Sequence, residues 1–323
     1  MDLIKDITEK LKGKNARIVF PEGEDKRILG ACARLAKEGV IVPVVLGKRS
    51  EVEATAKEIG VDLSTLEFVD IEKSDKFDEL CEAFVERRKG KVVPEDAKKI
   101  LLTPNYFGTM MVYKGYADGL VSGAVGTTAD TVRPALQIIK TVPGMSKTSG
   151  AFFMLRDDEM YLMADCAINI DPNSDDLAEI AVASDKTAKQ FGMDPKIAML
   201  SFSTKGSASH ELVDKVANAT AKALEMNPDL DLDGELQFDA AFVPSVGEKK
   251  APGSKVAGHA NVFVFPSLEA GNIGYKIGQR FGGFEAIGPV LQGLNSPVND
   301  LSRGCNEDEV VSLAKVTAAQ AKL

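Results

Sequence analysis

An arginine and a serine stand side by side near the carboxyl end of the chain, within Pro297-Val298-Asn299-Asp300-Leu301-Ser302-Arg303-Gly304-Cys305. Arg303 carries a permanent charge and a planar fork of donors, which suits a phosphate group or a developing oxyanion. Two acids follow, Asp308 and Glu309, and either carboxylate could accept a proton. Asn306 and Glu309 also have the spacing of a helix-capping pair, an alternative role for Glu309 that the sequence leaves open.

Two further segments combine glycines, hydroxyl groups and a cation, residues 119–134 and 201–208. Each contains or follows an apolar run that predicts a strand, and amides and hydroxyls at the end of such a strand can hold a phosphate. Ordinary capped helices and loops are also rich in these residues, so the spacing alone does not choose between the two interpretations. Together with Asn299, the candidate substrate contacts in these segments are Ser122, Thr127, Thr128, Arg133, Ser203, Thr204 and Lys205.

Several familiar catalytic signatures are missing from the sequence. It contains no G-x-G-x-x-G after the first predicted strand and no G-x-x-x-x-G-K-[ST], G-x-S-x-G or H-E-x-x-H. Dinucleotide dehydrogenases, P-loop kinases, serine hydrolases and zincins are therefore disfavoured. The cysteines are scattered without a C-x-x-C pair, so we expect reduced thiols, no disulfide framework and no bound metal.

The composition is that of an ordinary globular protein. The 323 residues are 44% hydrophobic and 27% charged, which suggests two domains with cores of normal size. The net charge of -9 argues against non-specific binding to nucleic acid or to an anionic membrane, so an anionic substrate needs a local basic cluster. The amino terminus lacks an apolar signal core and no apolar run is long enough to span a membrane, so we expect a cytoplasmic protein.

Apolar runs alternate with segments of helical periodicity along most of the chain, which predicts α/β architecture with mainly parallel sheets. Around residue 150 two β-rich runs joined by Arg156-Asp157-Asp158-Glu159 predict an antiparallel hairpin. We place one domain at residues 1–142 plus 293–323 and a second at 143–292. The last helix is expected to cross back to the first domain, because a lone helix cannot bury its apolar face.

Taken together, these segments resemble the phosphate acetyltransferase (phosphotransacetylase) family over essentially the whole chain. The resemblance implies the reaction acetyl-CoA + phosphate = CoA + acetyl phosphate. It also implies two α/β/α lobes of the isocitrate and isopropylmalate dehydrogenase type, an active-site cleft between them, and a homodimer formed through the second lobe. The substrates would be CoA, acetyl phosphate and phosphate, with no permanently bound cofactor. The matching segments are residues 106–110, 117–123, 128–135, 164–169, 200–207, 233–239, 266–272 and 297–305.

The resemblance also implies roles for individual residues. Ser302 is expected to steady the CoA thiolate and Arg303 the acyl phosphate, while Arg133 matches an arginine implicated in anion binding. The pair Arg87 and Arg88 lies where a further basic contact to CoA is expected, and the sequence does not say which of the two makes it.

One position departs from the family pattern. The family usually has an aspartate seven residues after the serine, taken as the base that deprotonates CoA, and this chain has Glu309 there with Asp308 just before it. Either the glutamate acts with a longer side chain, or the helix shifts so that Asp308 acts. We favour Glu309 on register.

Two alternatives concern the route and the function. An acetyl-enzyme on Cys166 or Cys305 competes with direct transfer in a ternary complex, which we favour because CoA brings its own thiol nucleophile. The rival functions are phosphate butyryltransferase or another acyl-chain variant, a non-catalytic acetyl-CoA-binding regulatory module, and a decarboxylating dehydrogenase of similar fold.

Overall fold

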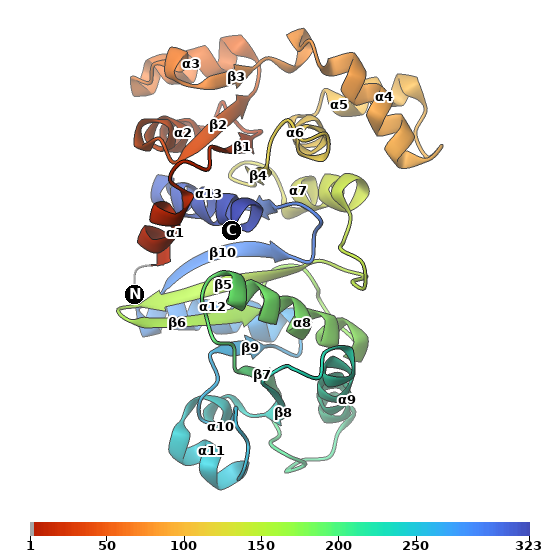
Figure 1. Ribbon diagram of the computed structural model, residues 1–323, viewed down its shortest axis with the longest axis vertical. Coiled ribbons are helices and arrows are strands. Elements are labelled where there is room, and N and C mark those ends of the chain that lie inside the picture. Colours follow the sequence, from red (N-terminus) through yellow and green to blue (C-terminus); the bar gives the residue numbers. More distant parts are fainter. Residues whose placement is uncertain (1–2) are drawn as a thin grey trace. The chain divides into compact units, whose positions relative to one another are not determined.

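A computed structural model describes residues 3–323, which divide into two compact units. The first unit comprises residues 3–142 and 294–323, and the second comprises residues 143–293. Each unit is an α/β fold with a mainly parallel sheet, which confirms the predicted fold class (Figure 1).

The sheet of the first unit has the strand order β11-β4-β1-β2-β3, and every neighbouring pair in it is parallel. The strands β1, β2 and β4 read as apolar runs, as expected for strands covered on both faces. In a parallel sheet all the carboxyl ends of the strands lie on one edge, so the loops that follow β1, β4 and β11 gather there. The strands are β1 (Ala16–Phe20), β2 (Ile41–Leu46), β3 (Glu67–Val69), β4 (Gly119–Ser122) and β11 (Val298–Asp300).

Helices cover this sheet, and α13 packs against α1, α2, β1 and β4 within the first unit. The helical segment that follows β4 changes its hydrogen-bond pattern part of the way along. It is α-helical only to Pro134 and continues as a π-helix, because proline has no amide hydrogen to donate. The helices are α1 (Leu3–Leu11), α2 (Lys26–Glu38), α3 (Arg49–Ile59), α4 (Phe77–Arg88), α5 (Pro94–Leu101), α6 (Pro104–Tyr113), α7 (Thr128–Pro134), η3 (Ala135–Ile139) and α13 (Glu307–Lys322), with short 3-10 turns η1 (Leu63–Thr65) and η2 (Ile71–Lys73).

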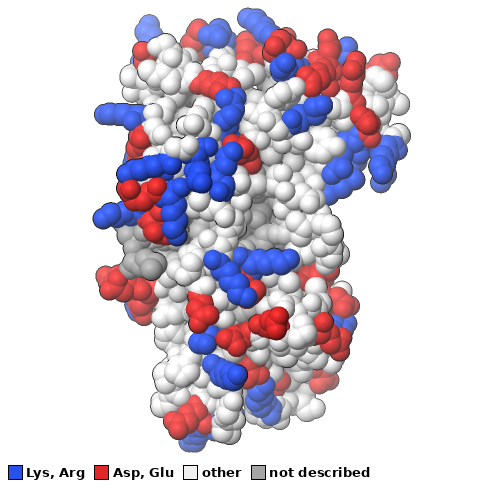
Figure 2. Space-filling view, in the orientation of Figure 1, with Lys and Arg blue, Asp and Glu red and all other residues white. Residues whose placement is uncertain are grey.

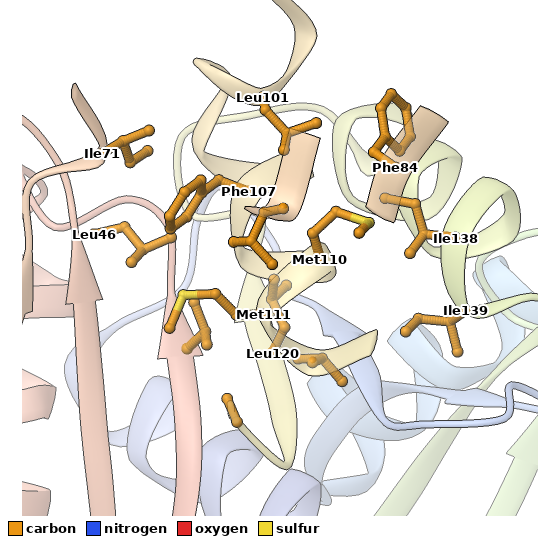
Figure 3. Close-up of a cluster of buried hydrophobic side chains, with 14 of the residues drawn as sticks. Leu46, Ile71, Phe84, Leu101, Phe107, Met110, Met111, Leu120, Ile138 and Ile139 are labelled. Carbon is orange, nitrogen blue, oxygen red and sulfur yellow. The ribbon is translucent and has the colours of Figure 1, made fainter. Parts of the chain in front are cut away.

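The core of the first unit forms between α6 and its neighbours. Phe107 and Met110 of α6 are fully buried, and their cluster also contains Leu46, Phe84 and Leu120 (Figure 3). Burying such side chains contributes about 1.5 to 3 kcal/mol each. This packing gives the loops at the sheet edge a rigid base.

The second unit has the strand order β10-β5-β6-β9-β7-β8. The predicted hairpin is confirmed, since β5 and β6 pair antiparallel from Arg156–Glu159 outward, while β6, β9, β7 and β8 are parallel. The strands are β5 (Ser149–Arg156), β6 (Glu159–Ala164), β7 (Ile197–Leu200), β8 (Leu232–Leu236), β9 (Val262–Val264) and β10 (Glu285–Gln292). The helices are α8 (Ser174–Gln190), α9 (Glu211–Met226), α10 (Phe238–Phe242), α11 (Pro244–Lys250) and α12 (Leu268–Gly282).

Acidic and basic side chains are interspersed on the face of the molecule shown in Figure 2. Within residues 3–323 no helix combines the length and the apolar character needed to cross a membrane.

Candidate active site

Three loops meet at the carboxyl edge of the first unit's sheet. Residues 21–25 follow β1, residues 123–127 follow β4 and residues 301–306 follow β11. Ligands bind at this edge in doubly wound sheets. The loops that carry the candidate residues of the first unit therefore lie at a typical ligand-binding edge.

The loop after β11 presents Ser302 and Arg303 to solvent. It is anchored where the Leu301 amide donates to the Ser122 carbonyl at 2.7 Å. The Nε of Arg303 donates to the Gly126 carbonyl at 3.2 Å. The structure thus holds the guanidinium of Arg303 at the end of residues 123–127, the glycine-rich loop.

The amino terminus of α7 lies at the same place. Thr127 caps the helix, and its amide and hydroxyl both donate to the Asp130 carboxylate, at 2.9 and 2.8 Å. These hydrogen bonds from Thr127, aided by the nearby charges of Arg133 and Arg303, lower the pKa of Asp130. Thr128 follows in the exposed first turn of α7. The two threonines and the two arginines are therefore brought together at one exposed site.

The main-chain amides of residues 123–126 are not free to hold a phosphate, which was one of the two interpretations that the sequence left open. The carboxylate of Glu22 accepts hydrogen bonds from the amides of residues 123, 124, 125 and 126 at 3.0, 2.8, 3.0 and 2.8 Å. Glu22 comes from Pro21-Glu22-Gly23 after β1 and is only 8% exposed. The sequence signal for Glu22 was its place just after the buried strand β1, whereas the sequence analysis singled out basic and hydroxyl residues.

Arg27, at the start of α2, is a second residue that the sequence analysis missed. Its guanidinium donates to the carbonyls of Ala124, Arg303 and Cys305 at 2.8, 2.7 and 3.0 Å. It also pairs with Asp25 at 2.8 Å. One side chain thus joins the glycine-rich loop to the loop that carries Ser302 and Arg303.

Asp300 ends β11 below these loops and is 2% exposed. Burial raises its pKa to about 6; Glu22 adds to the rise, and Thr128, Thr131 and Arg303 oppose it. Within residues 3–323 its Oδ1 meets no hydrogen-bond donor. The oxygen lies so close to Gly123 that a Cβ there would come within 2.4 Å of it, and Gly123 has a φ of +108°. This position therefore requires glycine.

Ser122 and Asn299, two of the predicted substrate contacts, are fully buried. The hydroxyl of Ser122 donates to the Asn105 side-chain oxygen at 2.9 Å. The side-chain amide of Asn299 donates to the side chains of Thr317 and Gln320 of α13 at 2.8 and 2.6 Å. Both side chains are used inside the protein, where they support the ends of β4 and β11.

Both candidate bases are already engaged at the start of α13. Glu309 and Asn306 form a reciprocal capping box, each side chain accepting from the other's amide at 2.9 Å. Asp308 is 78% exposed and pairs with Arg34 of α2. The spacing that predicted a cap is confirmed, and capping does not use up the second oxygen of the Glu309 carboxylate.

Arg87 and Arg88 lie at the end of α4, close to the π-helix η3. Arg87 donates to the carbonyls of Ile138 and Ile139 at 2.7 and 3.2 Å, and its guanidinium stacks 4.7 Å from the Tyr113 ring. Arg88 donates to the Gln137 carbonyl at 3.5 Å, and its buried Nε meets no acceptor within residues 3–323.

These two arginines belong to a cluster of cations. The charge of Arg87, with a contribution from desolvation and from Lys89, Arg88 and Lys91, lowers the pKa of Lys140. Cations that repel one another in this way form a surface that favours an anion.

In the second unit, Ser203, Thr204 and Lys205 follow β7, and the segment of residues 233–237 occupies their polar groups. The Glu235 carboxylate accepts from the Ser203 hydroxyl at 3.1 Å and from the Gly206 amide at 2.7 Å. The Thr204 hydroxyl accepts from the main-chain amide of Gln237 at 2.9 Å, and Lys205 forms an ion pair with Asp233. An internal carboxylate, Glu235, thus occupies this segment, which the sequence offered as a phosphate site.

The cysteines are all buried. Burial raises the pKa of Cys305 to about 11 and raises the pKa of Cys166 well above its usual value. Within residues 3–323 no group of His, Cys, Asp and Glu side chains is arranged to hold a metal ion.

Comparison with known proteins identifies the family. The family described as phosphate acetyl/butaryl transferase matches residues 2–318. The chain is 62% identical to a phosphate acetyltransferase from Bacillus subtilis, over 99% of each chain. It is 58% identical to a solved phosphotransacetylase from Streptococcus pyogenes, with a TM-score of 0.95 over 99% of this chain and 98% of the other. The EutD phosphotransacetylase from Staphylococcus aureus gives 58% identity and a TM-score of 0.93 over the same shares.

A more distant likeness concerns the fold alone. A 4-hydroxythreonine-4-phosphate dehydrogenase from Burkholderia phymatum is 12% identical, with a TM-score of 0.54 over 96% of this chain and 99% of the other. The match to the family along nearly its whole length, together with these identities, shows that the chain belongs to the phosphate acetyl/butaryl transferase family.

Proposed function

We propose that the chain is an acyltransferase that moves an acetyl group reversibly between CoA and phosphate, with its chemistry at the carboxyl edge of the first unit's sheet. The observation that carries the location is the position of Arg303, whose guanidinium is fixed against Gly126 beside the exposed amino terminus of α7. The acetyl group as substrate follows from the names of the relatives that are 58 to 62% identical. CoA and acetyl-CoA are substrates in this proposal, and no permanently bound cofactor is required.

The transfer is proposed to be direct. The CoA sulfur attacks the carbonyl carbon of acetyl phosphate, the carbon–sulfur bond forms, and the carbon–oxygen bond to phosphate breaks. Forming a thiolate from a thiol of pKa about 8.5 at pH 7 costs roughly 2 kcal/mol. Stabilising the oxyanion and the leaving phosphate is the larger demand, since loss of one donor to such a centre typically costs about 3 to 4 kcal/mol. Arg303 is the proposed donor to these groups, and Ser302 is proposed to steady the CoA thiolate.

Substrate phosphate is proposed to lie against side chains at the amino terminus of α7. Thr127 and Thr128 offer hydroxyls there, and Arg133 offers a positive charge. The base is proposed to be Glu309, with Asp308 as the alternative. Ser203, Thr204 and Lys205 are not included in this proposal, because Glu235, Gln237 and Asp233 already bind them within the second unit.

The phosphates of CoA are proposed to bind the cation cluster of Arg87, Arg88, Lys89, Lys91 and Lys140. Support comes from the mutual repulsion that lowers the pKa of Lys140, which a bound polyanion relieves. Arg88 is the better candidate for direct contact, because its guanidinium is held by a long hydrogen bond of 3.5 Å to the Gln137 carbonyl, while Arg87 is tied to two carbonyls and to Tyr113.

The protein is further proposed to be a cytoplasmic homodimer. Support comes from α12 of the second unit, where Ile273, Ile277 and Phe281 repeat every four residues and are 56%, 52% and 91% exposed. Such a stripe of large apolar side chains favours a partner, and a second copy is the simplest one. Phe281→Glu should shift the mass measured by light scattering from two chains to one.

A CoA-release assay tests the function. Acetyl-CoA and phosphate should yield free CoA rapidly, and butyryl-CoA run in parallel should react more slowly. Faster reaction with butyryl-CoA would favour the acyl-chain variant. Binding of acetyl-CoA without release of CoA would favour a regulatory module.

A further inference from the structure

We propose that Glu22 is a positioning residue, an internal carboxylate that fixes the glycine-rich loop and keeps substrate phosphate out of the amide nest formed by residues 123–126. Phosphate is thereby left to the hydroxyls and arginines at the end of the loop. This inference rests on the proposed function and adds a residue to it.

The geometry of the nest is that of an anion site. Consecutive amides that point at one centre after a strand form the arrangement with which proteins bind phosphate. Here each oxygen of Glu22 accepts two of the four amides, at 2.8 and 3.0 Å. A carboxylate is an acceptor only, so the four donors are matched by four lone-pair directions and the site is full.

Glu22 is itself held in place. The amide of Gly23 donates to the Leu46 carbonyl at 3.1 Å, and the carbonyl of Glu22 accepts from the Asp25 amide at 3.0 Å. A Cβ at residue 23 would come within 2.4 Å of Val45, so the chain lies directly on β2. The carboxylate therefore projects into the nest from a rigid support.

The nest in turn sets the position of Arg303. The amide of Gly126 binds Glu22, and its carbonyl binds the Nε of Arg303. Loss of the carboxylate would leave four amides without an acceptor and release the loop between β4 and α7. A displacement of about 1 Å in a group that acts on the reacting atoms can cost about a hundredfold in rate.

The first test compares Glu22→Gln with Glu24→Gln in the CoA-release assay. The amide of glutamine keeps one acceptor oxygen for the nest but turns a donor toward the remaining amides. Glu24 lies in the same loop and is exposed, so the same chemical change there serves as the matched control. We expect kcat of Glu22→Gln to fall about 10- to 100-fold, with the KM for CoA nearly unchanged and Glu24→Gln close to the wild type.

The second test uses Glu22→Ala and formate, a small carboxylate that fits the vacated nest. Formate should raise the melting temperature of Glu22→Ala and restore part of its turnover in a saturable manner, while chloride at equal ionic strength should not. Neither salt should have these effects on the wild type or on Glu24→Gln. High phosphate should also inhibit Glu22→Ala, because phosphate can then enter the nest.

The outcomes separate this inference from the proposed function. Wild-type CoA release tests the function, and the response of melting temperature to formate needs no turnover at all. The inference is overturned if both Glu22 variants keep wild-type kinetics, or if their losses vanish once rates are normalised to the folded fraction measured by near-ultraviolet circular dichroism. Should the alanine variant fail to fold, the comparison of the two glutamine variants decides alone.

Discussion

The guanidinium of Arg27 donates to the main-chain carbonyl of Arg303 at 2.7 Å, although 276 positions separate the two residues in the chain. The same group binds the carbonyl of Ala124, so a single side chain sets the distance between two loops that carry candidate site residues. Arg303, the proposed contact to the substrate, is thus held through its backbone by Arg27.

Replacing Arg27 should therefore slow the reaction. Arg27→Lys keeps the charge but loses the planar fork that reaches Asp25 and the carbonyls of both loops at once. We expect kcat to fall about 10- to 100-fold by misplacement of Arg303, with a lower melting temperature. Lys26→Met, a change at the exposed neighbouring residue, is the control. Wild-type kcat in a folded Arg27→Lys protein would refute the positioning role.

Arg303→Ala should remove most turnover and leave the fold intact. The side chain is exposed and its Nε donates to the Gly126 carbonyl at 3.2 Å, so little of the protein's stability depends on it. If it stabilises developing charge, kcat should drop roughly a hundredfold or more. Arg303→Lys, which keeps the charge without the fork, should be intermediate. The measurement is kcat with the melting temperature alongside, and a fully active alanine variant would remove Arg303 from the mechanism.

Glu309→Gln separates catalysis from capping. Glutamine serves the capping box as well as glutamate, so the melting temperature should change little. If Glu309 is the base, turnover should fall about 10²- to 10⁴-fold.

Asp308→Asn is the matched variant for that comparison. It removes the exposed pair with Arg34, which is worth at most about 1 kcal/mol. Activity profiles of both variants across pH decide between the two acids. A silent Glu309→Gln together with an inactive Asp308→Asn would move the base to Asp308.

Asp300 should make stability depend on pH. Its pKa is about 6 in the folded protein, mainly through burial, against about 3.9 in an unfolded chain. The folded state thus binds more protons between about pH 4 and 6, and this group's contribution to stability falls as pH rises through that window.

Asp300→Asn should remove that dependence. Relative to the wild type, its free energy of unfolding should gain up to about 3 kcal/mol above pH 6, and the gain should fade below pH 4. Urea unfolding of both proteins at pH 4, 5, 6 and 7 measures it. A constant difference between the two proteins across this range would show that Asp300 titrates normally.

A protein with all its cysteines replaced by alanine should remain active. A thiol of pKa about 11, as in Cys305, is ionised in only about one molecule in ten thousand at pH 7. The enzyme therefore gains little from a cysteine nucleophile when CoA brings a thiol of its own. The checks are kcat of the variant and mass spectrometry of the wild type with acetyl phosphate and no CoA. An acetyl thioester trapped on the protein would overturn direct transfer.

Local signals in the sequence determined the α/β alternation, the hairpin after residue 150 and the cap of α13. Each depends on residues close together in the chain: buried strands read as apolar runs, and Asn306 with Glu309 has the spacing of a capping box. β11 escaped prediction because its residues, Val298-Asn299-Asp300, carry too weak an apolar pattern, and it exists only by pairing with β4.

The occupant of the glycine-rich loop was decided by the tertiary structure alone. The sequence offered the amides of residues 119–134 as one way to hold an anion, and in the structure the anion on residues 123–126 is Glu22, from about a hundred positions earlier. The nest that the sequence suggested after β7 is likewise filled by Glu235. Buried amide donors must have acceptors, so a run of such amides in the sequence indicates that some acceptor lies nearby. Only the packing of strands that are distant in the sequence determines which residue supplies that acceptor.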